Sequence, residues 1–432
     1  MSAKDKLAFL IALMFLGSAA ATLAQKGTKP NLLFILTDQH RRDGVGAYEM
    51  APVKTPNLDR LAAEGIRFNR AYTAQPVCAP NRAAIMSGLY PHNHGVLENT
   101  WDMNSDIPIL PDLFRRHGYR TGYFGKWHLG DPARDAWDVM PIYPGDGRGK
   151  GHYFEENGKQ VYQTDIISRD AINFMKAASG KPFCLFASFY PPHPPYSVPE
   201  KYEALYADIF PNDEHRRKYY AMCSAVDEAA GKLLNALDEL DIAKNTLVVF
   251  TTEHGHQFEH RWNDHDKRLC YDIAARVPLL MRFPGVIPDG QVSDALFSAV
   301  DLYPTMATLL GLSYEKRLDG VNLSNQITQR TDKGRANLVM VNVPFIDKEP
   351  NPNRPAFEKG EERCVIEGDW KLILSTVREP ELYNLTEDPA EVNNCWVAMR
   401  NTATVGKLKE ALTTWSGWTD DKLAPSLLEE IE

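Results

Sequence analysis

The chain has 432 residues, which is too long for one ordinary core and long enough for a large domain with a smaller one. A hydrophobic content of 44% is normal for a soluble globular protein. The net charge of −9 argues against a nucleic-acid partner, and an anionic substrate would have to be held by a local cluster of cations or a metal ion.

Residues 1–24 have the features of a signal peptide. Lys4 and Lys6 supply the positive charge, and the apolar run 7–16 is followed by mostly small residues up to Ala24. The run is too short to span a bilayer, so we expect cleavage after Ala24, with an uncleaved anchor as the alternative. The mature protein is then exported, to the periplasm, the cell surface or the medium.

The first predicted strand covers residues 31–36 (NLLFIL), an uninterrupted apolar run that suits a sheet covered on both faces. Asp38 and Gln39 follow it directly. Binding sites in parallel sheets form beyond the carboxyl ends of the strands, so these two oxygen-bearing side chains are candidate ligands. A helix is expected at 56–65, where a glycine ends it.

The segment 77–84 (VCAPNRAA) predicts a helix that begins at a cysteine. Pro80 suits the first turn, and Arg82 lies four residues after Cys78, so both side chains share one face. A helix N-terminus attracts anions. A cysteine there, one turn from a guanidinium, is a candidate nucleophile for an anionic substrate, and a buried core cysteine is the alternative interpretation.

A helix at 110–118 precedes a short strand at 121–124 that leads to Lys126 and His128. These two side chains lie two residues apart and so share one side of an extended segment, although such a pair is often only solvated. Residues 131–158 are rich in glycine, proline and aspartate, and we expect a long loop near the site.

A helix at 166–178 and a buried strand at 182–189 come next. The strand runs into a proline-rich loop that restrains His193, which is either a site residue or a packed loop residue. An amphipathic helix is expected at 216–240.

A third buried strand, 246–250, leads to Glu253 and His254, and Lys267 follows in a polar loop. Asp38, together with these residues, therefore belongs to a set of polar side chains at strand ends.

A strand at 277–283 and a helix at 299–310 complete the larger unit, which we place at 25–330. Strands alternating with helices predict an α/β fold with a large, mostly parallel sheet flanked by helices. The remaining part, 331–432, is polar and turn-rich and predicts a smaller antiparallel α+β subdomain. Its strands are expected at 364–366, 370–374 and 381–385.

The six cysteines are scattered and show no zinc-type spacing. If Cys78 is kept for chemistry, an odd number remains, so at least one more thiol is unpaired. The candidate ligands Asp38, Gln39, Glu253 and His254 are mostly hard oxygen donors, which suit calcium, magnesium or manganese better than zinc. Each pair taken alone is equally typical of helix caps and surface residues.

Taken together, these segments resemble the formylglycine-dependent (type I) sulfatases of the alkaline phosphatase superfamily. CAPNR at 78–82 fits the motif Cys-x-Pro-x-Arg, and GKWHLG at 125–130 is similar to a second family motif. RVPLLMRFPG at 276–285 and ELYNLTEDPAEVNN at 381–394 follow in the family order. The resemblance spans nearly the whole mature chain and implies an alkaline phosphatase-like fold.

The resemblance implies that a separate maturation enzyme oxidises Cys78 to formylglycine. One hydroxyl of the aldehyde hydrate would attack sulfur, and His128 would take a proton from the other, which releases sulfate. Arg82 would hold the formylglycine, and Lys126 would bind sulfate oxygens. Lys267 would share that role.

The resemblance also implies that His193 protonates or stabilises the leaving oxygen. A divalent cation, Ca2+ first with Mg2+ or Mn2+ as alternatives, would be held by residue 78 and the strand-end residues Asp38, Gln39, Glu253 and His254. Two positions depart from the family, because Gln39 and Glu253 stand where the family usually has Asp. The site is therefore either intact with a changed metal affinity or impaired.

The implied function is hydrolysis of a sulfate monoester, with a sulfated carbohydrate favoured by analogy. A phosphonate or phosphate ester hydrolase of the same superfamily is one alternative, and a catalytically impaired binder of sulfated glycans is another. The expected partners are the substrate and the maturation enzyme, without nucleic acid. Nothing in the sequence predicts the sugar or the oligomeric state.

Overall fold

The computed structural model describes most of the mature chain. The described ranges are 29–131, 134–143, 152–178, 180–258, 267–314, 316–331, 334–343 and 360–431. The predicted signal peptide lies outside them. Within these ranges, no helix has both the length and the apolar character that a membrane span requires.

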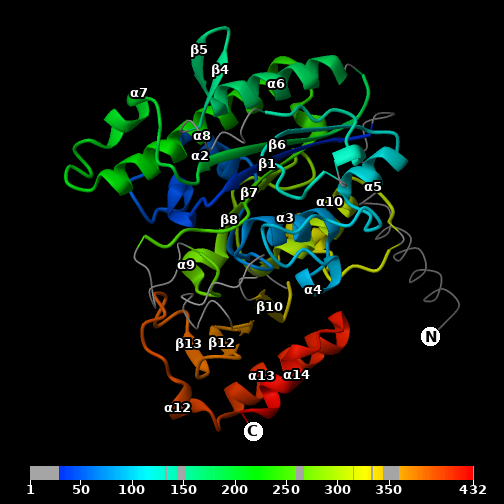
Figure 1. The fold of residues 1–432 in the computed structure, drawn as a ribbon. Coiled ribbons are helices and arrows are strands. Elements are labelled where there is room, and N and C mark those ends of the chain that lie inside the picture. Colours follow the sequence, from blue (N-terminus) through cyan, green and yellow to red (C-terminus); the bar gives the residue numbers. More distant parts are fainter. Residues whose placement is uncertain are drawn as a thin grey trace, which may run out of the picture.

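A seven-stranded mixed sheet with the order β3-β6-β1-β7-β8-β2-β9 forms the centre of the larger domain (Figure 1). Every pairing is parallel except those of β8, which runs antiparallel to both β7 and β2. The predicted α/β class is confirmed. The bounds are β1 (Asn31–Asp38), β2 (Ile66–Tyr72), β3 (Arg120–Gly125), β6 (Phe183–Pro192), β7 (Thr246–Thr252), β8 (Arg276–Arg282) and β9 (Gln291–Ser298).

Strand β1 shows why its sequence is apolar throughout. Its alternate residues face opposite sides of the sheet, and both sides are covered by helices. Leu33 and Ile35 pack against α2 (Pro56–Ala63), α6 (Gln163–Ala178) and α8 (Glu214–Glu239).

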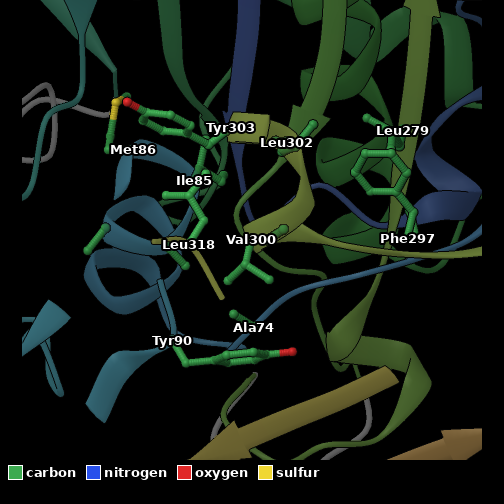
Figure 2. Packing of buried hydrophobic residues seen from close by; sticks show 14 of the residues in the cluster. Ala74, Ile85, Met86, Tyr90, Leu279, Phe297, Val300, Leu302, Tyr303 and Leu318 are labelled. Carbon is green, nitrogen blue, oxygen red and sulfur yellow. The ribbon is translucent and has the colours of Figure 1, made fainter. Parts of the chain in front are cut away.

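The opposite face of the sheet carries a second layer of helices. Leu32 and Phe34 belong to the same apolar cluster as α3 (Cys78–Ser87), α5 (Leu110–Arg116) and α10 (Leu302–Leu309). In Figure 2, Ile85 of α3 lies among side chains that include Tyr303 of α10. Helix α3 is buried along its whole length, which fixes its first residue relative to the sheet.

The smaller C-terminal unit is built on an antiparallel sheet, as predicted, and this sheet has four strands, one more than expected. Its strands are β10 (Asn337–Asn342), β11 (Glu362–Glu367), β12 (Trp370–Ser375) and β13 (Glu381–Asn384). The predicted β11–β12 hairpin turns at Gly368, whose φ of +57° belongs to the left-handed region that favours glycine. Helices α12 (Trp396–Met399), α13 (Ala403–Thr419) and α14 (Leu423–Glu429) follow, and this unit lies below the large sheet in Figure 1.

The structure adds elements that the sequence pattern does not predict, notably β2, β9 and β10. Strand β2 interrupts its apolar residues with Arg67, Asn69 and Arg70, and its register with β8 shifts between Phe68 and Ala71. That irregularity destroys the period-two alternation. The shorter helices are α4 (Pro91–His94), α7 (Glu200–Glu203), α9 (Asp272–Ala275) and α11 (Ser324–Gln329).

The prediction of one long loop at 131–158 is wrong where this segment is described. A 3-10 turn (Arg134–Ala136) occupies part of it, and β4 (Tyr153–Glu156) pairs with β5 (Lys159–Tyr162) in a hairpin. The polar composition of this hairpin conceals it, because only a minority of its side chains are buried.

Candidate active site

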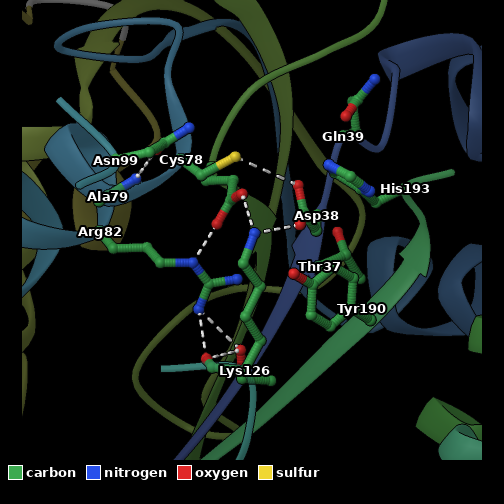
Figure 3. Close-up of polar contacts among 12 residues, drawn as sticks. Thr37, Asp38, Gln39, Cys78, Ala79, Arg82, Asn99, Lys126, Tyr190 and His193 are labelled. Atoms are coloured by element: carbon green, nitrogen blue, oxygen red, sulfur yellow. Dashed lines mark hydrogen bonds and ion pairs between the residues drawn. The ribbon is translucent and has the colours of Figure 1, made fainter. Parts of the chain in front are cut away.

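The edge of the sheet where β1 and β7 end carries the two candidate carboxylates. These strands are adjacent and parallel, with Thr37 opposite Thr252, so the residues that follow them meet. Asp38 is the last residue of β1, and Glu253 comes directly after β7. Both side chains are fully buried. Figure 3 shows Asp38 between Cys78 and Lys126.

Helix α3 brings Cys78 to this edge, as the sequence predicts. Val77 is extended and Cys78 is the first helical residue. Asn81, which the sequence interpretation did not single out, joins the helix to the strand end because its Nδ2 donates to the Glu253 carbonyl at 2.6 Å. At the helix start, the Ala79 amide donates to Asn99 Oδ1 at 2.9 Å.

Four predicted residues could hold a metal ion. The ligand atoms of Asp38, Cys78, Glu253 and His254 all lie within 4.8 Å of one another and are buried. Cys78 Sγ lies 3.2 Å from His254 Nε2 and 3.8 Å from Asp38 Oδ1. Two carboxylates with one imidazole fit a divalent cation. An oxygen in place of the Cys78 sulfur would add another hard ligand, the kind that calcium and magnesium prefer.

Two buried cations balance the carboxylates. Arg82 forms an ion pair with Glu253, and Lys126 forms ion pairs with Asp38 and, at 3.2 Å, with Glu253. Arg82 Nη1 also donates to the Lys126 carbonyl at 2.6 Å and to Ser188 Oγ at 2.9 Å. Although burial disfavours both cations, the neighbouring carboxylates raise the pKa of Arg82 and of Lys126.

Gly125 explains how Lys126 reaches this cluster. Its φ is +109°, and a Cβ there would lie 1.9 Å from the Ser188 carbonyl oxygen. Glycine is therefore required for the close approach of β3 to β6. The Lys126 amide then donates to the same Ser188 carbonyl at 3.0 Å.

The thiol of Cys78 lies among positive charges. Lys267 Nζ is 3.2 Å from the sulfur. Burial and Asp38 act in the opposite direction, but Lys126, Lys267 and His254 hold the pKa of Cys78 well below its usual value. The position therefore stabilises negative charge, which is what a nucleophile and an anionic substrate both require.

The two carboxylates respond differently to burial. Burial, with the negative charges of Asp38 and Cys78, raises the pKa of Glu253 well above its usual value, although Arg82 opposes this. For Asp38, burial also acts upward, but His193 and Lys126 lower its pKa well below normal.

Two histidines complete the cluster. Burial, reinforced by the charge of Lys126, lowers the pKa of His128 to about 4, so its imidazole is neutral at neutral pH and can accept a proton. Its Nδ1 is buried and has no hydrogen-bond partner in the described part of the chain. Burial likewise lowers the pKa of His193 to about 4, and its Nδ1 lies 2.6 Å from the Pro194 carbonyl.

Gln39 is accommodated by partners that match an amide. Its Oε1 lies 3.3 Å from Lys267 Nζ, and its Nε2 lies 2.8 Å from His256 Nδ1. Its φ of +65° turns the chain sharply after β1. The structure thus brings the predicted site residues to one edge of the sheet. Arg82 and Lys126 pair with the carboxylates, His254 and Lys267 lie 3.2 Å from Cys78 Sγ, and His193 acts on the charge of Asp38.

The comparisons with known proteins agree with this geometry. The profile described as Sulfatase matches residues 30–312, more than half of the chain, and that of the N-sulphoglucosamine sulphohydrolase C-terminal region matches 258–416. The chain belongs to the sulfatase family. It is therefore a sulfuric ester hydrolase by family.

Individual relatives support the same assignment. The sulfatase is 31% identical to an ulvan-active sulfatase of Formosa agariphila over 75% of this chain and 70% of the relative. It is 26% identical to an N-acetylglucosamine-6-O-sulfatase of Bacteroides thetaiotaomicron over 89% and 86%, respectively. A structure solved with D-glucosamine-2-N,6-O-disulfate matches with a TM-score of 0.80 at 24% identity, over 91% of this chain and 99% of the other, and so shows the fold.

A buried ion pair between Arg268 and Glu98, which the sequence did not predict, supports the sulfatase site from outside the cluster of candidate ligands. Arg268 donates to both carboxylate oxygens of Glu98, at 2.7 and 3.0 Å. Its φ of +97° is unusual for a residue with a side chain, and its amide donates to the Pro76 carbonyl. Arg268 follows Lys267, and Glu98 precedes Asn99, which accepts a hydrogen bond from Ala79 at the start of α3. This pair therefore joins two sides of the site. Glu98 follows no predicted strand, so no sequence signal marked it.

Proposed function

We propose that this sulfatase hydrolyses a sulfate monoester of a carbohydrate. It would use formylglycine made from Cys78 by a maturation enzyme, and a divalent cation held by Asp38, Gln39, Glu253 and His254. The observation that carries the proposal is the position of Cys78, at the start of a buried helix and within reach of Lys267, a carboxylate and an imidazole. A bound cation would polarise the sulfate group and lower the cost of its charge.

The carbohydrate class is supported by what the relatives are named for. One acts on ulvan and another on N-acetylglucosamine-6-O-sulfate. The structure of a third relative was solved in complex with a neocarrahexaose. It is 27% identical to this chain and matches with a TM-score of 0.75 over 91% of this chain and 94% of the other. We infer the same broad class here and leave the sugar open.

The residues of this chain divide the reaction between them. Residue 78 supplies the oxygen that displaces the alcohol from sulfur, and Lys126 and Lys267 hold the negative charge of the sulfate oxygens. His128 is neutral at neutral pH and accepts the proton of the second hydroxyl on residue 78, so that sulfate departs and the aldehyde is restored. His193 faces the leaving oxygen and stabilises it.

The intact mass of the peptide containing residue 78 tests the modification. Conversion of the thiol to the aldehyde lowers the mass by about 18 Da and creates the carbonyl that nucleophilic catalysis needs. We expect this loss in protein made with a maturation enzyme. If protein made together with the maturation enzyme still carries an unmodified cysteine, the chain is better described as an impaired glycan binder than as an enzyme.

Turnover tests the reaction class. The expected result is faster turnover of an aryl sulfate than of a phenyl phosphonate monoester, with activity lost in Cys78→Ala and kept in Cys395→Ala, which removes a thiol outside the site. A preference for the phosphonate would assign the chain to that activity instead. Export rests on residues 1–24, and N-terminal sequencing of the mature protein should begin at Gln25.

A further inference from the structure

A cleft of about 490 Å³ is lined in part by residues that closely follow the candidate site residues in the chain. It is joined to the site by two segments. Arg41 lines the cleft two residues after Gln39, and Gln257 lines it one residue after His256. Gln39 and His256 are themselves hydrogen-bonded at 2.8 Å. The volume is within the range of ligand sites, about 300–1,000 Å³.

The cleft is rich in arginine, and one of its arginines lacks a carboxylate partner. Arg41 pairs with Asp43, and Arg276 pairs with Asp272. Arg216, also in the lining, pairs with an aspartate next to its helix. Arg42 differs, since no carboxylate of the described residues lies within ion-pair distance of it.

Arg42 is held in place by neutral groups. Its Nη1 donates to the Asn69 carbonyl at 2.7 Å, and its Nε lies 3.2 Å from the sulfur of Met50. Burial and the like charge of Arg276 lower its pKa. The oxygens of nearby Asp272 are taken by Lys371 and Arg276. The cleft therefore has positive charge to offer an anion.

Gln257 provides a second, independent observation. Its side chain is 1% exposed, and neither its amide oxygen nor its amide nitrogen has a hydrogen-bond partner in the described structure. A buried polar group without a partner lowers stability, because it has lost its hydrogen bonds to water. A donor and an acceptor on one side chain match a sugar hydroxyl, which can both accept and donate.

We propose that this cleft binds the sugar residue adjacent to the one whose sulfate is removed, with Arg42 binding an oxyanion of that sugar and Gln257 binding a hydroxyl. The inference rests on the proposed function and adds to it a preference for acidic carbohydrates. Sulfate and carboxylate share the required chemistry, because a guanidinium binds either group with paired N–H donors. Tyr220 and Tyr271 add aromatic surface to the lining.

The test compares Arg42→Ala with Arg120→Ala. Arg120 is a matched control: like Arg42 it is half-buried, donates to a backbone carbonyl and lies over an aromatic ring, but it lies outside the cleft. Substrates carry the same hydrolysable sulfate on oligosaccharides whose adjacent sugar is neutral, carboxylated or sulfated, with an aryl sulfate as the reference.

We expect Arg42→Ala to raise KM about tenfold for the substrates with an acidic neighbour, since a charge-assisted hydrogen bond is lost. For the neutral and aryl substrates the increase in KM should be several-fold smaller. Arg120→Ala should leave KM unchanged for every substrate. Whichever acidic substrate responds more identifies the oxyanion. Equal effects of the two variants on every substrate would overturn the proposal.

A second variant and a binding measurement separate this inference from the proposed function. Gln257→Leu should raise KM for all the oligosaccharides relative to the aryl sulfate, and it remains usable if Arg42→Ala fails to fold. If the wild-type protein hydrolyses no sulfate ester, the proposed function fails. Calorimetry with the sulfated oligosaccharide then tests the cleft directly, and binding unchanged by Arg42→Ala would refute it.

Discussion

Two buried lysines show how this molecule uses similar charge clusters for different purposes. Lys371, on β12, donates to the Cys270 carbonyl at 3.0 Å, to Asp272 at 2.5 Å and to Glu391 at 2.7 Å. All three of its N–H groups are thus satisfied. Lys126 faces two carboxylates and lies 4.7 Å from the centre of the Tyr190 ring.

The two lysines differ mainly in whether the buried polar groups around them have hydrogen-bond partners. Next to Lys126, Nη2 of Arg82 and Nδ1 of His128 are buried and have no hydrogen-bond partner among the described residues. Burial opposes the charge on Lys371, but Asp272 and Glu391 raise its pKa well above normal. The Lys371 cluster is closed and joins the C-terminal sheet to the large domain, whereas the Lys126 cluster has bonding capacity for a ligand.

The largest expected effect is on stability, from Lys371→Met. The substitution leaves Glu391 buried without its cation and Asp272 with Arg276 alone, and the loss of one partner of a buried pair costs about 3–5 kcal/mol. Denaturant unfolding measures the change. The control Lys422→Met removes an exposed pair and should leave the free energy of unfolding nearly unchanged. A Lys371→Met protein as stable as the wild type would mean that the closed cluster has no structural role.

The second prediction concerns activity, from Lys126→Met. Removing a group that stabilises developing negative charge typically lowers kcat by about 10²–10³-fold, and we expect that loss in sulfate ester turnover. The fall in unfolding free energy should be smaller than for Lys371→Met, because Arg82 still faces Glu253 and the charges of His193 and Lys267 still act on Asp38. Steady-state kinetics and unfolding of both variants give a reciprocal pattern if the comparison holds. An active but unstable Lys126→Met protein would reverse it.

The third prediction concerns the supporting pair beside the site. Glu98→Gln weakens the hold on Arg268, and so on the adjacent Lys267, and a small displacement of a group that contacts the reaction lowers kcat by about tenfold to a hundredfold. Glu64→Gln is the control, because it weakens a bond from a half-exposed glutamate to another buried arginine, Arg282, away from the site. If both variants keep wild-type kcat, Glu98 does not position Lys267.

The sequence predicts most of this architecture where local pattern and tertiary structure agree. The strand at 31–36 is confirmed because burial on both faces demands a continuous apolar run. The site residues could be predicted as a group because parallel strands end at one edge. The Lys371 cluster could not, since Asp272 and Glu391 are 119 residues apart in the chain and only folding joins them.

A buried carboxylate that lacks a lysine sharpens the comparison through its pH dependence. Asp227 accepts hydrogen bonds from the Asn57 and Leu58 amides at the start of α2. Burial raises its pKa to about 6, although the Leu58 hydrogen bond opposes the shift. In the unfolded chain the pKa is about 3.9, so the folded state binds more protons between these values.

The sign of the effect follows from that difference. The contribution of Asp227 to stability is complete below about pH 4 and is lost as the pH rises through about 6, at most about 1.4 kcal/mol per pH unit. Asp227→Asn keeps an acceptor oxygen but does not titrate. Relative to this variant, the free energy of unfolding of the wild type should fall by about 2 kcal/mol between pH 4 and 6. Parallel curves for the two proteins would mean that amide donors alone keep the pKa of a buried carboxylate from rising, as Lys126 and its neighbours do for Asp38.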